Sequence, residues 1–410
     1  MGGAQPHRDR LAVWTHEQAG EQVAFGDPAV SDAERAAAGR ETVADRWQGL
    51  LPSNRSRAET AYSAASLPEG QDIVRVWRPR DPAELRARLW PVAGTDDLWE
   101  ASLRIRRLAE AMITIVAAAR RAGGNPPSQL PDLRVWRGPQ APADLPGWPL
   151  DGRPLSGQGL RGQPLGGPGR HGTVEEHTLD SAALRAPRRV TVYRPPEPAG
   201  ALPGCILADG QSAPGFAQVL EHAILAGTAP PVLLVGVHHG SSTPGDRSDR
   251  RAQEYLPGYN RRRFDAHLRF VTDEVIPWAG ERFGPVSGTW AASGFSNGGA
   301  WAIGAGQRRP DLFGAVAAFS AGIVPKRISR DARLAGIRHY LAAGTLEPGF
   351  RRSTGWWADR LQRAGLPCRH EEWIGGHDQL WWEQQLPVAL SWLLPAPTKL
   401  ASFRSAGGGI

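Results

Sequence analysis

The second half of this chain predicts an α/β domain in which helices cover both faces of a mostly parallel β-sheet. Three observations predict it. Apolar runs of strand character recur after residue 172, helical patterns separate several of them, and the proline- and glycine-dense composition of residues 123–172 ends there. Strand and helix in alternation are typical of a parallel sheet, because parallel neighbours are joined by crossovers that pack on its faces. The chain has 410 residues, 41% of them hydrophobic, so it can form two or three domains.

The predicted sheet is built from seven short runs, namely 188–195, 204–210, 231–239, 288–296, 313–321, 337–345 and 368–376. The clearest helix is predicted over 261–283, where apolar residues recur with helical spacing. We expect this domain to span residues 173–396 and to be followed by a flexible tail over 397–410.

A small separate domain is predicted over residues 66–130. Short apolar runs with turn signals predict β-strands within 71–105, and a basic amphipathic pattern over 104–122 predicts a helix. A proline- and glycine-rich linker over 131–172 is expected to connect this domain to the larger one.

The first 65 residues are polar and are expected to be partly disordered or helical. One helix is predicted over 31–50, where Ser31 and Glu34 have the spacing of a capping box.

The positive charge of the chain comes almost wholly from arginine. The formal net charge is +7, and Lys326 and Lys399 are the only lysines. A genome rich in G and C explains this composition, and no nucleic-acid motif accompanies it, so we expect no nucleic-acid partner. A local site for an anionic ligand is the remaining interpretation.

Three further features bear on where the protein acts. Cys205 and Cys368 are the only cysteines, and both lie in apolar strand-like runs, which predicts neither a disulfide framework nor a metal site. The N-terminus has no apolar leader, and no run of 18 apolar residues occurs, so we expect no membrane partner. The expected location is the cytoplasm.

The stretch GFSNGGAWAIG at 294–304 carries the strongest chemical signal. Ser296 lies where a predicted strand ends and a helix rich in small residues begins. Gly294 and Gly298 remove the Cβ atoms that would collide in so tight a turn, which leaves the serine hydroxyl exposed at its tip. A structural turn is the alternative, but the strand-to-helix context favours a nucleophile.

A serine nucleophile needs a base, and in this topology the acid and then the histidine should follow it in the chain. His377, in WIGGHDQLWW, lies in a glycine loop after the last predicted strand. His370 and His339 are alternatives, but each lies within a strand-like run. His377 is therefore the predicted base.

Glu347 follows the strand run 337–345 and is the predicted acid, with the role of orienting His377. Asp359 lies further into the next helix, and Asp378 neighbours the histidine but should point away from it. A Ser–His pair without a strong acid also remains open. The backbone N–H groups of Asn297 and of Gly210 or Gln211 are the predicted donors to an oxyanion.

Several motifs together resemble the enterobactin (enterochelin) esterase family of the α/β-hydrolases. In the second half they are ILADGQSA, RAQEYLPGYN, GFSNGG, AGTLEPG and GGHDQLWW; in the first half they are LWPVAGTDDLWEASLRI and GPQAPADLPGW. The resemblance implies an α/β-hydrolase domain preceded by a small immunoglobulin-like β-sandwich. After Ile105 that family continues with another strand pair, whereas this chain has the helix-like pattern described above.

The resemblance also implies an activity, which is hydrolysis of the serine-ester bonds of ferric catecholate trilactone siderophores to release iron. Such a substrate is a bulky anion with aromatic faces, so arginine and aromatic side chains suit it. The substrate-side candidates are Phe216, Arg251, Tyr255, Trp381 and Trp382, and packing in the core or at the rim is the alternative for each.

Two other functions remain open at this point. One is a carboxylesterase or thioesterase for aryl or feruloyl-type esters, since fold and triad do not define the pocket. The other is a homologue without turnover that binds an anionic ligand. The predicted chemistry needs no metal and no organic cofactor, and the expected partner is a small-molecule ester.

Overall fold

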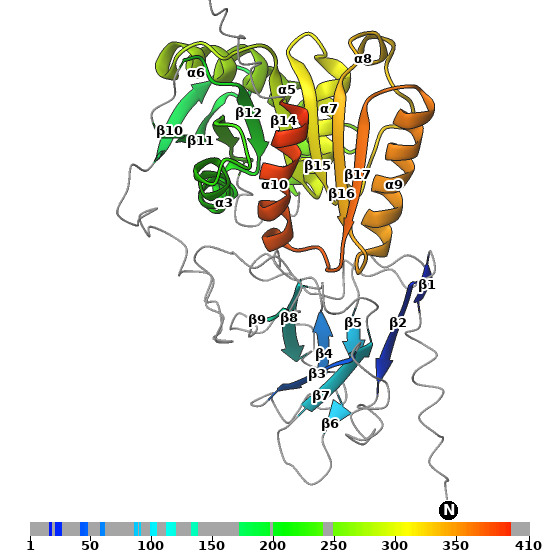
Figure 1. Ribbon diagram of the computed structural model, residues 1–410. Helices are drawn as coiled ribbons and strands as arrows, with labels where there is room; N and C mark the ends of the chain where they lie inside the picture. The colour runs from blue at the N-terminus through cyan, green and yellow to red at the C-terminus, as the bar shows by residue number, and fades with distance from the viewer. Residues whose placement is uncertain are drawn as a thin grey trace, which may run out of the picture.

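The computed structural model describes residues 172–196, 200–240 and 249–394 in full, and nine β-strands between His16 and Arg137 by their backbone (Figure 1). We first consider the large domain. Within the described residues, no helix combines the length and the apolar composition needed to cross a membrane.

The large domain contains one eight-stranded sheet, with spatial order β10-β11-β13-β12-β14-β15-β16-β17. The strands are β10 (Thr173–Ser181), β11 (Ala186–Arg194), β12 (Gly204–Ala208), β13 (Leu233–Val237), β14 (Trp290–Phe295), β15 (Phe313–Phe319), β16 (Arg338–Gly344) and β17 (Cys368–Trp373). Pairing is antiparallel from β10 to β13 and parallel from β13 to β17. The predicted α/β class is confirmed.

Each of the seven predicted runs contains one strand of this sheet, and β10 is the strand that the pattern missed. Its segment, TVEEHTLDS, has no continuous apolar run, and its residues alternate between exposed and half-buried. Such alternation belongs to an edge strand with one solvated face, which gives a weaker signal than a strand buried on both faces.

Helices cover the two faces and divide the core in two. On one face α3 (Ala213–Leu225) and α10 (Gln379–Leu393) lie side by side and pack Phe216 and Leu386 against Cys205 and Leu207 of β12 (Figure 1). On the other face α5 (Arg261–Arg269), α6 (Ile276–Phe283), α7 (Asn297–Arg308) and α9 (Pro348–Arg363) contribute to one core that includes Ile206 and Ala208. Successive strand residues point to opposite faces, so β12 serves both cores.

The helix predicted over 261–283 is present as α5, a π-helical segment at Phe270–Val275, and α6. Two shorter helices complete the domain. They are α4 (Arg250–Tyr255) and α8 (Arg330–Leu334).

The first half forms two antiparallel sheets. One has the order β1-β2-β7-β3, with β6 paired to β7, and the other has the order β5-β4-β8-β9. The strands are β1 (His16–Gln18), β2 (Glu21–Gly26), β3 (Thr42–Trp47), β4 (Ala58–Ala61), β5 (Arg86–Arg88), β6 (Trp90–Pro91), β7 (Trp99–Arg104), β8 (Met112–Ala119) and β9 (Leu133–Arg137).

Both helices predicted in the first half are wrong where the structure describes them. The helix expected over 104–122 is replaced by β8, which pairs with β4 and β9. The helix expected over 31–50 is replaced at Thr42–Trp47 by β3, which pairs with β7. The apolar run MITIVAAA suits a strand paired on both edges as well as a helix, and such runs are not separated by periodicity.

The sheets also cross the predicted domain boundaries. Strands before residue 65 pair with strands after it, as β4 does with β8, so the N-terminal segment contributes to both sheets. β9 falls within the predicted linker over 131–172 and extends the second sheet. The remainder of residues 1–65 and of the linker, and the predicted tail over 397–410, lie outside the described residues.

Glu383 on α10 is a carboxyl group buried in the second core, with 4% of its surface exposed. Its pKa is raised to about 8, mainly by burial and in smaller part by the charge of Asp378, while the hydrogen bond from Gln379 Nε2 opposes the shift. The α3 helix approaches so closely that a Cβ on Gly215 would lie 2.2 Å from Glu383 Oε1. The folded protein therefore holds this group neutral at pH 7.

Replacing Glu383 with glutamine is expected to remove a loss of stability that the wild type suffers as the pH rises. Between the unfolded pKa of 4.5 and the folded value of about 8, only the unfolded chain releases this proton. Each pH unit in that window should therefore cost the wild type about 1.4 kcal/mol of unfolding free energy. Glutamine keeps an acceptor for Gln379 and has no proton to release.

Urea unfolding of both proteins at pH 5, 6, 7 and 8 measures this difference, and the exposed Glu281→Gln variant on α6 is the matched control. Buried histidines with a lowered pKa, such as His267, make all three proteins less stable on acidification. This contribution is the same in each protein and cancels when their unfolding free energies are compared. Parallel stability curves for wild type and Glu383→Gln would refute the shift.

Candidate active site

Ser296 occupies the sharp turn between β14 and α7. Its backbone has φ 55° and ψ −123°, a conformation that residues with a side chain rarely adopt. A Cβ on Gly294 would lie 2.5 Å from the backbone of Gly298, and one on Gly298 would lie 2.9 Å from Asp209 Oδ2. The two glycines are therefore required by close packing, and the turn presents Ser296 at its tip.

The structure brings His377 and Glu347 together from separate loops. His377 follows β17, and Glu347 follows β16 at the N-cap of α9. The Nδ1–H of His377 donates to Glu347 Oε2 over 2.6 Å, with 4% of the histidine and none of the glutamate exposed. A carboxylate can only accept, so this bond selects the tautomer in which Nε2 carries a free lone pair.

Two rings hold the imidazole plane. Phe350 of α9 stacks on His377 with ring centroids 4.0 Å apart, and Trp382 of α10 meets it edge-on at 4.7 Å. Among the described residues, Ser296 Oγ and His377 Nε2 have no hydrogen-bond partner. The hydrogen bond between a catalytic serine and its histidine is often long before a substrate binds.

Glu347 accepts two further hydrogen bonds, which sequence reasoning missed. Oε1 accepts from the Ser320 hydroxyl and from the Gly344 N–H, each at 2.6 Å, and Trp382 Nε1–H donates to Ser320 Oγ at 2.8 Å. Ser320 follows β15, the neighbour of the nucleophile strand, at φ 49°. The sequence signal for this role of Ser320 was a polar residue directly after β15.

The predicted oxyanion donors lie at two adjacent helix starts. Gly210 and Gln211 begin a short 3₁₀ helix directly after β12, and Asn297 is the first residue of α7. Helix starts leave N–H groups unpaired. In the described part of the chain neither the Asn297 nor the Gln211 backbone N–H has a partner. Close packing of Gly298 against Asp209 keeps these two helix starts adjacent.

Arg251 is not a free cation. Its guanidinium makes a bidentate pair with Asp209 at 2.7 and 2.6 Å and donates to the Phe295 carbonyl at 3.3 Å. Tyr255 Oη accepts from the Asp209 N–H at 2.9 Å and donates to the Val237 carbonyl at 3.4 Å. Arg251 and Tyr255 thereby tie α4 to the loops on either side of the candidate oxyanion donors.

The other three substrate-side candidates lie in the core. Phe216 and Trp382 have no exposed surface and Trp381 has 5%. Phe295 stacks between Phe216, at 5.7 Å, and Trp382, at 4.3 Å. In this conformation these three side chains, like the fully buried Tyr255, offer a ligand almost no surface, and the core-packing alternative matches their burial.

The structure keeps the alternative acids and bases away from these roles. His339 is fully buried in β16, where burial lowers its pKa to about 4, and His370 lies in β17. Asp378 caps α10 by accepting from the Leu380 N–H, and Asp359 pairs with Arg363 on α9. Among these candidates, Glu347 alone is hydrogen-bonded to His377.

Replacing Arg251 with alanine is expected to destabilise the fold by about 3–5 kcal/mol, because the buried Asp209 carboxylate loses its counter-charge. Arg251→Lys keeps the charge but not the two-pronged contact, so its loss should be smaller. Urea unfolding measures both, with the exposed Arg262→Ala on α5 as control. A raised KM for an anionic ester with unchanged stability would instead mean that Arg251 faces the substrate.

The family model described as Putative esterase matches residues 181–393, which is more than half of the chain. A comparison with curated proteins gives no match.

Among solved structures, the enterochelin esterase from Shigella flexneri is similar at TM-score 0.55 and 18% identity, over 86% of this chain and 92% of that one. The ferric enterobactin esterase from Salmonella typhimurium is similar at TM-score 0.57 and 19% identity, over 86% and 93%. A third structure, the Shigella flexneri enterobactin esterase in the presence of enterobactin, has TM-score 0.58 and 18% identity, over 86% and 92%. At these identities the likeness shows a shared fold. Together with the family match over the whole eight-stranded domain except β10, it establishes that the chain belongs to the Putative esterase family and is a carboxylic ester hydrolase.

Proposed function

We propose that this protein is a serine esterase in which Ser296, His377 and Glu347 carry the reaction. The observation that carries the proposal is the 2.6 Å bond from His377 Nδ1–H to the buried Glu347, in a domain whose Ser296 is held in a strained turn. The tautomer selected by Glu347 leaves Nε2 able to accept a proton.

The reaction follows from these roles. His377 Nε2 takes the proton of the Ser296 hydroxyl as its oxygen attacks the ester carbonyl. The N–H groups of Asn297 and of Gln211 or Gly210 bind the resulting oxyanion. The tetrahedral intermediate collapses, the alkoxide leaves with the proton from His377, and an acyl-enzyme remains. Water then repeats the same steps, losing a proton to His377 and releasing the acid and the serine.

We further propose the substrate class implied by the resemblance, the ester bonds of catecholate trilactone siderophores in their ferric or iron-free form. The names of the Shigella and Salmonella relatives support this class, since one was solved in the presence of enterobactin. We assign the activity to the cytoplasm, where the free thiols of Cys205 and Cys368 persist. Iron would enter only as part of the substrate.

One observation favours a second candidate, an esterase for uncharged aryl or feruloyl-type esters. Arg251, the cation expected to meet a ferric tris-catecholate, already neutralises Asp209. An ester without a net charge needs no such cation, and the Ser–His–Glu chemistry is the same for both classes.

Hydrolysis of ferric and iron-free enterobactin and of a simple aryl ester by the purified protein, followed by chromatography, separates these candidates. We expect the wild type to give linear products of enterobactin and Ser296→Ala to give none. Cleavage of the aryl ester without cleavage of enterobactin would leave the serine esterase in place and discard the siderophore assignment. Binding of either ester without turnover would overturn both candidates.

A further inference from the structure

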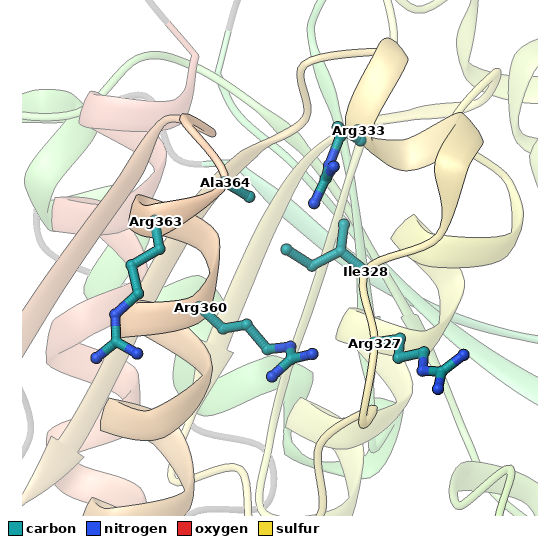
Figure 2. A pocket seen from close by; sticks show the side chains of 6 residues that line it. All are labelled: Arg327, Ile328, Arg333, Arg360, Arg363 and Ala364. Carbon is teal, nitrogen blue, oxygen red and sulfur yellow. The ribbon is translucent and has the colours of Figure 1, made fainter.

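A cavity of about 430 Å³ lies between α8 and the last turn of α9 (Figure 2). Its lining residues are Arg327, Ile328, Arg333, Arg360, Arg363 and Ala364, and we call it the arginine pocket. Arg333 and Arg360 extend toward Ile328 from facing helices in Figure 2. Two guanidinium groups, from α8 and α9, thus face the same hollow, whereas those of Arg327 and Arg363 lie at its margins and point outward in this view.

Most of this charge has no counter-charge. Arg363 pairs with Asp359 one turn earlier on α9 at 2.6 Å. Among the described residues, no carboxylate lies within ion-pair distance of Arg327, Arg333 or Arg360. Like charges gathered in this way repel one another, and the arrangement becomes favourable when an anion occupies the space between them.

Helix dipoles account for part of the arrangement. Arg333 lies in the last turn of α8, and Arg360 and Arg363 lie in the last turn of α9, where cations stabilise the negative end of a helix. That effect does not require the side chains to meet. It also leaves out Arg327, which lies in the loop before α8 and nevertheless lines the same cavity.

We propose that the arginine pocket binds a small molecule with several phosphate groups. A guanidinium matches two phosphate oxygens in one plane, so Arg333 and Arg360 together suit a chain of phosphates better than a single anion. Arg360 also lies over the Trp356 ring, 5.1 Å from its centroid, which leaves its N–H groups in the guanidinium plane able to donate. The cavity volume falls within the usual range of small-molecule sites. Ile328 and Ala364 give it an apolar side.

This site is separate from the one that cleaves esters. Glu347 caps the first turn of α9, and the pocket lies at the last turn, 16 residues along the same helix. At about 1.5 Å per residue, the two ends of α9 are about 24 Å apart. The proposal therefore does not depend on the proposed siderophore activity.

Calorimetric titration of the purified protein with inorganic triphosphate, in magnesium-free buffer at physiological salt, tests the site. The pocket variant is Arg333→Gln with Arg360→Gln, and the matched control, Arg262→Gln with Arg269→Gln, removes the same charge from exposed positions on α5. We expect binding to weaken at least about tenfold in the pocket variant and to be unchanged in the control. Aryl-ester hydrolysis should be equal in all three proteins and reports that each is folded.

Titrations with ATP and with inorganic phosphate show which group is recognised. If ATP binds as tightly as triphosphate, the phosphate chain is the recognised group. If ATP binds more tightly than triphosphate and this binding is lost in the pocket variant, the site also recognises the nucleoside. Inorganic phosphate that binds as tightly as triphosphate would overturn the requirement for several charges. Absence of binding, or equal weakening in the pocket and control variants, would overturn the site itself.

Discussion

Replacing Ser296 with alanine is expected to lower kcat for ester hydrolysis by about 10⁶-fold, because the acyl-enzyme can no longer form. The strain at φ 55° is the same for alanine as for serine, so stability should change little. The hydroxyl has no hydrogen-bond partner among the described residues, so its removal leaves no buried group unsatisfied. Initial rates with a chromogenic aryl ester measure the loss, and urea unfolding verifies the fold.

Ser293 provides the matched control for this prediction. It lies three residues earlier on β14 and is fully buried, and its hydroxyl also lacks a hydrogen-bond partner within the described residues. Ser293→Ala should retain the activity of the wild type. Retention of activity in Ser296→Ala would mean that the turn at Ser296 is structural. A comparable loss in Ser293→Ala would mean that the loss in Ser296→Ala does not identify the nucleophile.

The candidate triad could be predicted from sequence because local geometry constrains it. A serine between glycines at a strand-to-helix turn has few other uses, and the order Ser, Glu, His follows from where the strands end. The hydrogen bond between His377 and Glu347 matches that expectation. Spacing along the chain was sufficient to pair His377 with Glu347 because both residues follow parallel strands, whose carboxyl ends meet at one edge of the sheet.

The residues predicted to meet the substrate could not be placed in the same way. Their motif put Arg251 and Tyr255 together near the oxyanion loop, and the structure does place them there. Sequence does not reveal which carboxylate an arginine will meet, and Asp209 lies 42 residues away in the chain. The pairing that neutralises Arg251 is therefore a product of the tertiary fold.

The helix predictions for the first half of the chain were wrong for a related reason. Over 104–122 the local pattern was compatible with a helix, but pairing with β4 and β9 made Met112–Ala119 a strand. The resemblance, which implied further strands after Ile105, was the better guide at this point. Neighbours distant in the chain decided the structure, as is common for strands whose stability comes from pairing.

Replacing Glu347 with glutamine is expected to lower kcat by about 10⁴-fold, with KM nearly unchanged. The amide can face His377 with its NH₂ group, which forces Nδ1 to accept a hydrogen bond. The proton then lies on Nε2, so Nε2 has no free lone pair to take the proton of Ser296. Ser320→Ala removes one of the two further donors to Glu347 and should cost only about tenfold.

The relative losses of these variants identify the acid. If Glu347 orients the base, Glu347→Gln loses far more activity than Ser320→Ala, and Asp378→Asn, which keeps an oxygen that can cap α10, retains most of it. Trp382 donates to Ser320, so Trp382→Phe should resemble Ser320→Ala without a change in the pH profile. Loss of activity in Asp378→Asn together with a mild effect of Glu347→Gln would transfer the role to Asp378. The 2.6 Å bond between His377 and Glu347 argues for the first result, because a buried acceptor at that distance fixes both the tautomer and the ring plane.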